Sequence, residues 1–254
     1  MSTRTVALLA ALAGMCLLAA STISIVRDRP PQPGVTDRTV TRHDGRGSAG
    51  QVHTRMESAC AGYVGLTIDD SPTGNTRNLI DALHTAGLRA TMFNIGQRAQ
   101  QNPDLVRAQR DAGLWIGNHT FSHPHLPTLT EAQVRSQLER TQEAVRQATG
   151  TAPRLFRPPY GETDETIRVL AQRLGLTEVL WDIDSEDWRG AGSAAIADAA
   201  SLLGSGMIIL LHDVPATTAA IPRIAADLAA RRLCAGMISP ETGRPVAPTP
   251  SATH

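Results

Sequence analysis

The stretch YVGLTIDDSPTGN, residues 63–75, sets the pattern for most of the chain. Its first part is apolar and predicts a buried strand, and its second part is rich in residues that build turns, with Asn75 able to begin a helix. Two carboxylates, Asp69 and Asp70, stand where the strand ends. Neighbouring aspartates repel each other, so this position is costly unless a positive charge lies close by. Taken alone, DDSP is most simply a turn. Whether the two carboxylates also have a function depends on the residues elsewhere in the chain.

The order of strand, polar turn and helix repeats from Tyr63 onward. Thr130 with Gln133 makes a capping box, and Pro103 suits the first position of a helix. The predicted strands are residues 63–68, 90–95, 114–119, 154–159, 177–184 and 206–213, and the predicted helices are 75–87, 102–113, 130–150, 164–174, one that begins at 193 and one that ends near 233.

Strands that alternate with helices predict right-handed crossovers and a parallel sheet. The pattern alone does not separate an open doubly wound sheet from a closed barrel. The units are somewhat few for an eight-fold barrel, so an incomplete or distorted barrel fits better than a full one. No Gly-rich phosphate loop follows any of the strands, which argues against a dinucleotide-binding fold.

Charge and the N-terminus restrict the class of protein. The 24 basic and 24 acidic residues cancel, and no basic stripe predicts a nucleic-acid partner. Residues 1–21 have one early positive charge, an apolar run and small residues at its end, which predicts a secretory signal cleaved near Ala20 or Ser21. An uncleaved membrane anchor is the alternative. Residues 22–57 are polar and without periodicity, which predicts a disordered linker.

Three cysteines are present, and Cys16 is expected to leave with the signal. In an exported chain the remaining pair, Cys60 and Cys234, predicts a disulfide that closes a long loop and adds up to ~5 kcal/mol of stability. Two unrelated buried thiols are the alternative.

Reactive side chains gather after the predicted strands. The carboxyl ends of parallel strands lie on one face of a barrel, where active sites are built. The segments expected at these strand ends are Asp69-Asp70, residues 118–125, residues 157–161, residues 182–188 and His212-Asp213.

His119 and His123 are four residues apart, which on a helical or tightly turned segment presents both imidazoles on one side. With a nearby carboxylate they predict a two-His, one-Asp metal site with open positions for water. A cation would also explain the aspartate pair, because one carboxylate can bind it while the other stays ionised as a base.

Five motifs in this order, TIDD (67–70), HTFSH (119–123), RPPYG (157–161), DSEDW (184–188) and LLHD (210–213), resemble those of the polysaccharide deacetylases. These are also called NodB-homology domains or family 4 carbohydrate esterases. The resemblance extends from Cys60 to Pro248 and is greatest to acetylxylan esterases and chitooligosaccharide deacetylases secreted by actinobacteria. It implies a distorted, incomplete (β/α) barrel over residues 58–248, followed by a tail over 249–254.

The resemblance also implies a role for individual residues. Zinc, or else cobalt, would be held by Asp70, His119 and His123. Asp69 would be the general base, held in place by Arg157.

The backbone N–H of Tyr160 would stabilise the oxyanion. His212 would be the general acid, oriented and charged by Asp187.

Further residues are assigned by type and place. Tyr160 and Trp188 are expected to bind substrate, since aromatic side chains suit a sugar, although both could instead be core. One of Leu210 and Leu211 is expected in the strand core and the other in the pocket for the acetyl methyl group, and we assign Leu211 to the pocket. His125 is expected to be a solvated loop residue.

One departure concerns the first motif, which commonly reads TFDDG in the family. Here Ile68 replaces Phe and Ser71 replaces Gly. Glycine would allow a left-handed turn, whereas Ser71 precedes Pro72 and is expected to be extended. The departure affects the shape of the loop and leaves every expected metal ligand in place.

The sequence therefore predicts a secreted, monomeric, metal-dependent hydrolase that removes acetyl groups from polysaccharides, with O-acetyl xylan as the first choice. N-deacetylation of chitin oligomers or peptidoglycan is the first alternative. A non-catalytic carbohydrate-binding protein with the same fold is the second.

Overall fold

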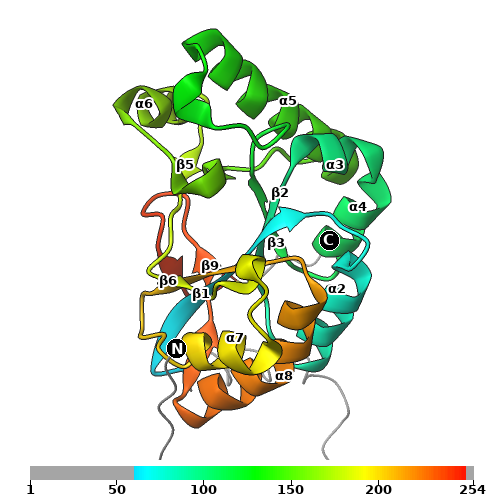
Figure 1. Ribbon diagram of the computed structural model, residues 1–254, viewed down its shortest axis with the longest axis vertical. Coiled ribbons are helices and arrows are strands. Elements are labelled where there is room, and N and C mark those ends of the chain that lie inside the picture. The colour runs from blue at the N-terminus through cyan, green and yellow to red at the C-terminus, as the bar shows by residue number, and fades with distance from the viewer. Residues whose placement is uncertain (1–59, 250–254) are drawn as a thin grey trace, which may run out of the picture. The chain divides into compact units, whose positions relative to one another are not determined.

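The computed structural model describes residues 60–249, which contain one eight-stranded parallel sheet and one small hairpin (Figure 1). The strand order is β5-β4-β3-β2-β1-β7-β6, with β8 paired to the start of β1. The strands are β1 (Gly62–Ser71), β2 (Thr91–Asn94), β3 (Trp115–Asn118), β4 (Leu155–Phe156), β5 (Thr177–Glu178), β6 (Ile183–Asp184), β7 (Ile208–His212) and β8 (Leu233–Ala235), and β9 (Met237–Ile238) and β10 (Pro245–Val246) form the hairpin.

Several sequence predictions lie outside the described residues. These are the signal or anchor over 1–21 with Cys16, the linker over 22–57, and the tail beyond residue 249. Within residues 60–249, no helix is long and apolar enough to cross a membrane.

The helices follow the strands as predicted, with one addition. They are α2 (Thr76–Thr85), α3 (Gly96–Gln101), α4 (Pro103–Asp111), α5 (Glu131–Thr149), α6 (Glu165–Arg173), α7 (Ser193–Ala200) and α8 (Pro215–Ala230). The capping box of Thr130 and Gln133 is confirmed at the start of α5, and Gly150 ends that helix with a φ of 84°. Helix α3 was not predicted, because it is short and no side chain caps it.

The sheet forms an incomplete barrel, as the sequence predicted. Its two edge strands, β5 and β6, are separated in the chain only by residues 179–182. The prediction of a single strand over 177–184 was wrong, because this segment belongs to both edges. Nε of Arg157 donates to the carbonyl of Val179 at 3.1 Å, and its NH2 donates to the carbonyl of Leu180 at 3.2 Å. The guanidinium thus binds two backbone carbonyl groups that would otherwise pair with a neighbouring strand.

Apolar side chains fill both faces of the sheet, as is usual for parallel strands. One cluster, which includes Ile209 and Leu211, packs β1 and β7 against α2, α7 and α8. Another joins Phe93 to Ile208 and other residues of strands that are not neighbours, which places it on the concave side of the curved sheet. In Figure 1, α7 and α8 lie below β1, while α5 and α6 lie at the opposite end.

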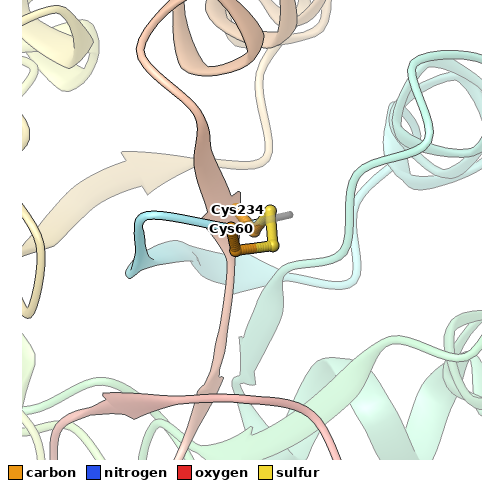
Figure 2. The surroundings of a disulfide bond; sticks show 2 residues. All are labelled: Cys60 and Cys234. Atoms are coloured by element: carbon orange, nitrogen blue, oxygen red, sulfur yellow. A yellow bond between two sulfur atoms is a disulfide. The ribbon is translucent and has the colours of Figure 1, made fainter. Parts of the chain in front are cut away.

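The predicted disulfide joins Cys60, two residues before β1, to Cys234 of β8 (Figure 2). The Cα atoms of Cys60 and Cys234 are 5.7 Å apart across a sequence separation of 174. The short strands β8, β9 and β10 were not predicted. The hairpin of β9 and β10 is tied to the sheet by Arg244, whose NH1 lies 2.7 Å from Asp182.

Candidate active site

The residues expected from the strand ends meet at one place. Asp69 of β1 is the register partner of His212 of β7. Nε2 of His119, which follows β3, lies 3.6 Å from a carboxylate oxygen of Asp69 and 3.6 Å from one of Asp70. The cluster brings together Asp69, Asp70, His119, His123, Arg157, Asp187 and His212.

A bulge in β1 turns both aspartates toward this cluster. Adjacent residues of a regular strand point to opposite faces, so Asp69 and Asp70 would normally be separated by the sheet. Between the pairs that Ile68 and Ser71 make with β2, strand β1 holds one residue more than its partner. Asp70 has a φ of 64°, in the left-handed region that aspartate enters more readily than most residues. Bulges re-aim side chains beside active sites, and this one brings two carboxylates to one side.

Asp70, His119 and His123 fit a divalent cation. Among the residues that the structure describes, their ligand atoms form a group lying within 4.8 Å of one another. Oδ1 of Asp70 is 3.6 Å from Nε2 of His119 and 3.5 Å from Nε2 of His123. Ligand atoms about 2.0–2.1 Å from a tetrahedral zinc ion are about 3.4 Å from one another. Oδ1 of Asp70 is also buried without a hydrogen-bond partner, and a cation would satisfy it.

Backbone geometry orients the two imidazoles. Nδ1 of His119 lies 2.8 Å from the carbonyl oxygen of Arg157, a contact that keeps the proton on Nδ1 and leaves Nε2 free as a ligand. His123 lies in a tight turn rather than a helix, with its N–H donating to Oγ1 of Thr120 at 3.1 Å. Burial lowers the pKa of His123, and the neighbouring His119 lowers it further. The neutral imidazole, which metal binding requires, is therefore favoured.

Asp69 is held by a buried arginine. NH1 of Arg157 donates to Oδ1 of Asp69 at 2.9 Å and to Oγ1 of Thr67 at 2.7 Å. Arg157 is fully buried, and burial lowers its pKa while Asp69 opposes that change. The guanidinium also lies over Phe93, 4.4 Å from the ring centre. Together these contacts fix the Asp69 carboxylate next to the candidate metal ligands Asp70 and His119.

His212 is held by a buried aspartate. Oδ1 of Asp187 lies 2.7 Å from Nδ1 of His212, and Oδ2 accepts the backbone N–H of His212 and the hydroxyl of Thr217, each at 2.6 Å. Burial would lower the pKa of His212, but the bond to Asp187 and nearby carboxylates raise it overall. Burial would raise the pKa of Asp187, but its bond to His212 makes it lower overall. The pair favours a protonated imidazole beside an ionised carboxylate.

Aromatic side chains are exposed beside the cluster. Tyr160 is 55% exposed and Trp188 is 53% exposed, so neither is core. The ring of Tyr160 meets the edge of His123 at 4.6 Å between centroids and stacks on His125 at 4.2 Å. His125 is exposed as predicted, yet it also binds Glu162, with Nδ1 2.8 Å from Oε2. These contacts fix the Tyr160 ring on the candidate metal ligand His123.

The assignment of Leu211 to a substrate pocket was wrong. Leu211 is fully buried in the apolar cluster that faces α2 and α8. Successive residues of a strand point to opposite faces, so Leu210 shares its face with His212. Leu210 therefore replaces Leu211 as the candidate for contact with an acetyl group.

Ser71 does not require the backbone freedom of glycine. The left-handed residue is Asp70, and the hydroxyl of Ser71 donates to Oδ2 of Asp213 at 3.2 Å. The serine therefore adds a hydrogen bond to the turn without strain at its own position.

Other supporting residues were missed or left without a role. Thr217 and Arg98 contact the cluster from elements that carry no motif, so no local signal marks them. Asp213 ends the LLHD motif but was given no role of its own. Asp182 accepts the N–H of Ile208 at 2.8 Å and stabilises the sheet. Asp184 lies 3.3 Å from Nε1 of Trp188 and positions that exposed ring.

Comparisons with known proteins agree with this architecture. Residues 57–179 match the family described as polysaccharide deacetylase. A solved family 4 carbohydrate esterase from Streptomyces lividans, in complex with acetate, is 59% identical with a TM-score of 0.74, and the match covers 75% of this chain and all of that one. A bifunctional xylanase/xylan deacetylase of Cellvibrio japonicus is 47% identical over 195 residues, which are 76% of this chain and 29% of the relative.

A peptidoglycan N-acetylglucosamine deacetylase of Listeria monocytogenes is 36% identical over 160 residues, covering 62% of this chain and 34% of that protein. The chain therefore spans about a third of the length of these two curated relatives.

Proposed function

The chain belongs to the polysaccharide deacetylase family, and from that premise we propose that it is a secreted, metal-dependent hydrolase of acetyl groups on carbohydrate polymers. The observation that carries the proposal is the unpartnered Oδ1 of Asp70, which faces Nε2 of both His119 and His123 beside the Asp69–Arg157 pair. A carboxylate and two neutral imidazoles suit zinc, with cobalt as an alternative.

A cation held by Asp70, His119 and His123 would polarise the acetyl carbonyl and make water a stronger nucleophile. Asp69 accepts the proton of the attacking water. Its contact with Arg157 keeps the carboxylate in one orientation during that step. The proposed base, Asp69, therefore lies directly beside the proposed metal ligands, as the reaction requires.

Charge that develops on the acetyl oxygen is stabilised by the backbone N–H of Tyr160. His212 donates a proton to the departing hydroxyl or amine, and acetate is released. The raised pKa of His212 supports this role, because the imidazole keeps its proton to a higher pH. Asp187 holds the ring so that Nδ1 is occupied and Nε2 is available to the substrate.

Exposed aromatic side chains and one leucine supply the substrate contacts. Tyr160 and Trp188 offer flat apolar faces to a sugar ring, and Leu210 faces the acetyl methyl group. The first substrate we propose is O-acetylated xylan, supported by the 47% identity to a xylan deacetylase. The alternative is N-deacetylation of peptidoglycan or chitin oligomers, supported for peptidoglycan by the 36% identity to a deacetylase of that polymer.

The remaining proposals concern the chain as a whole. We assign the catalytic domain to residues 58–248, preceded by a signal or anchor and a linker. The Cys60–Cys234 disulfide supports export, because such bonds persist in oxidising compartments. We expect the protein to act as a monomer on acetylated polysaccharides.

Acetate release tests the proposal. The purified full chain is stripped of metal and assayed on acetylated xylan, N-acetylated chitin oligomers and peptidoglycan, each with zinc and with cobalt. Fastest release from xylan supports O-deacetylation, and faster release from either N-acetylated polymer supports the alternative. Asp69→Asn is the control for background hydrolysis. No acetate from any substrate with either metal would leave a non-catalytic carbohydrate-binding protein as the explanation.

A further inference from the structure

Asp213 is a buried carboxylate that the roles proposed above do not use. It follows His212 at the end of β7 and is 2% exposed. Its carboxylate oxygens accept hydrogen bonds from Oγ of Ser71 at 3.2 Å, Nδ2 of Asn75 at 3.0 Å and the hydroxyl of Thr76. Three donors bind this one buried carboxylate, and together they fix its position relative to the turn.

The three donors lie between the last residue of β1, Ser71, and the first residue of α2, Thr76, directly after the aspartate pair. The backbone of Asp213 is bound to the same segment, since its N–H donates to the carbonyl of Asp69 at 3.1 Å and its carbonyl accepts the hydroxyl of Thr73 at 3.1 Å. Asp213 thus holds the residue before Asp70 by its backbone and the residue after it, Ser71, by its side chain. Asp70 lies between two fixed points.

Asp70 needs such support because its backbone is strained. A residue other than glycine keeps a left-handed φ only where the surrounding structure enforces it. Arg98 of α3 donates to the carbonyl of Asp70 from one side, and Asp213 holds the following turn from the other. If the bulge relaxed, the Asp70 carboxylate would turn away from His119 and His123.

We propose that Asp213 is a positioning residue of the metal site, which holds the β1–α2 turn so that Oδ1 of Asp70 faces the two histidines. The proposal rests on the proposed role of Asp70 as a ligand. Residues that orient metal ligands typically change metal affinity by about 10- to 100-fold when they are replaced.

Zinc affinity of the full-length protein tests this role. Asp213→Asn keeps the shape of the side chain but replaces one acceptor oxygen by an N–H donor that faces other donors. We expect zinc to bind about tenfold more weakly or worse in equilibrium dialysis. With substrate, the KM should stay near that of the wild type, while kcat should fall and recover in excess zinc.

The matched control is Asp182→Asn, at the opposite end of β7. Asp182 lies next to β6 and accepts the backbone N–H of Ile208 at the start of β7, far from the bulge. Its side chain is 27% exposed and also pairs with Arg244, so it is less buried than Asp213. Asp182→Asn should lower thermal stability without changing zinc affinity. Ser71→Ala removes a single donor to Asp213 and should weaken zinc binding by a few-fold, and it carries the test if Asp213→Asn does not fold.

The outcomes separate this proposal from the proposed function. Unchanged zinc affinity in the variant that folds would overturn the role of Asp213 and leave the metal site standing. An equal loss of affinity in Asp182→Asn would also overturn it, because the effect would then be general destabilisation. A wild-type protein that binds no zinc would overturn the proposed function, and this inference with it.

Discussion

Asp69 and His212 are register partners on the neighbouring parallel strands β1 and β7. Each is fixed by a different buried residue, Asp69 by Arg157 at 2.9 Å and His212 by Asp187 at 2.7 Å. The carboxylate therefore has a cation beside it, and the imidazole has an anion. Neighbouring titratable groups in contrasting surroundings are what a base and an acid acting on one substrate require.

The first prediction concerns the pH dependence of stability in the metal-free protein. The folded pKa of His212 is raised above its ordinary value of 6.5. The contribution of protonated His212 to the free energy of unfolding is therefore fully present below about pH 6.5 and is lost as the pH rises through the raised pKa. In Asp187→Asn the main cause of the raised pKa is gone and burial remains, so acidification should no longer stabilise the protein through this residue. Urea unfolding at about pH 5.5 and about pH 9 measures the difference.

The Asp187 carboxylate does not disturb this comparison. Its pKa is lowered from 3.8, so its own contribution is present above that value and is lost only as the pH falls through the lowered pKa. The wild type should gain stability relative to Asp187→Asn on going from the alkaline to the acidic condition. Parallel pH profiles for the two proteins would contradict the assigned pairing.

The second prediction concerns the buried ion pair. Arg157→Gln leaves the Asp69 carboxylate buried without its charged partner, which should cost about 3–5 kcal/mol of unfolding free energy. The control is Arg154→Gln, because Arg154 forms an exposed pair with Glu241 at 3.4 Å. Such pairs contribute about 0–1 kcal/mol, so the control should differ little from the wild type. Equal effects of the two substitutions in urea unfolding would show that the buried Arg157–Asp69 pair adds no more stability than an exposed ion pair.

Much of the fold was predictable because its signals are local. Runs such as 63–68 and 206–213 are mostly apolar, and the ends of α5 carry their own capping residues. The edge of the sheet was not predictable in this way. Whether residues 177–184 form one strand or two depends on Arg157, which is distant in sequence and binds two of their carbonyl groups.

The same distinction applies to the site. Residue types at strand ends mark Asp69, His119 and His212, because topology brings those ends together. The choice between Leu210 and Leu211 could not be made from the sequence, because β7 is buried on both sides and shows no alternation. The role of Thr217 depends on how α8 packs against Asp187, which no motif records.

The third prediction concerns the disulfide. Free-thiol titration of the unfolded mature protein should find no thiol from Cys60 or Cys234, and reduction should lower the melting temperature. The loss should correspond to about 2–5 kcal/mol, because the bond constrains a long loop of the unfolded chain. The double variant Cys60→Ser, Cys234→Ser should melt at the lower temperature with or without reductant. Two titratable thiols in protein recovered from the medium would contradict a disulfide in the exported form.

The last prediction separates the adjacent aspartates. Asp69→Asn keeps the side-chain shape but removes the proton acceptor, which should lower turnover by about 10²- to 10⁴-fold while the protein still binds zinc. Asp70→Asn replaces an anionic ligand by a neutral one, so zinc affinity should fall first and excess zinc should restore part of the activity. His119→Ala should behave like Asp70→Asn, and His212→Ala like Asp69→Asn.

Metal content after dialysis and turnover with and without added zinc distinguish these cases. The bulge places the two carboxylates on one side, yet only Oδ1 of Asp70 is buried without a hydrogen-bond partner, whereas Oδ1 of Asp69 is bound by Arg157. That difference is the reason to expect metal loss at Asp70 and retention at Asp69. Zinc lost from Asp69→Asn but kept by Asp70→Asn would reverse the two roles, and zinc kept by both would remove Asp70 from the metal site.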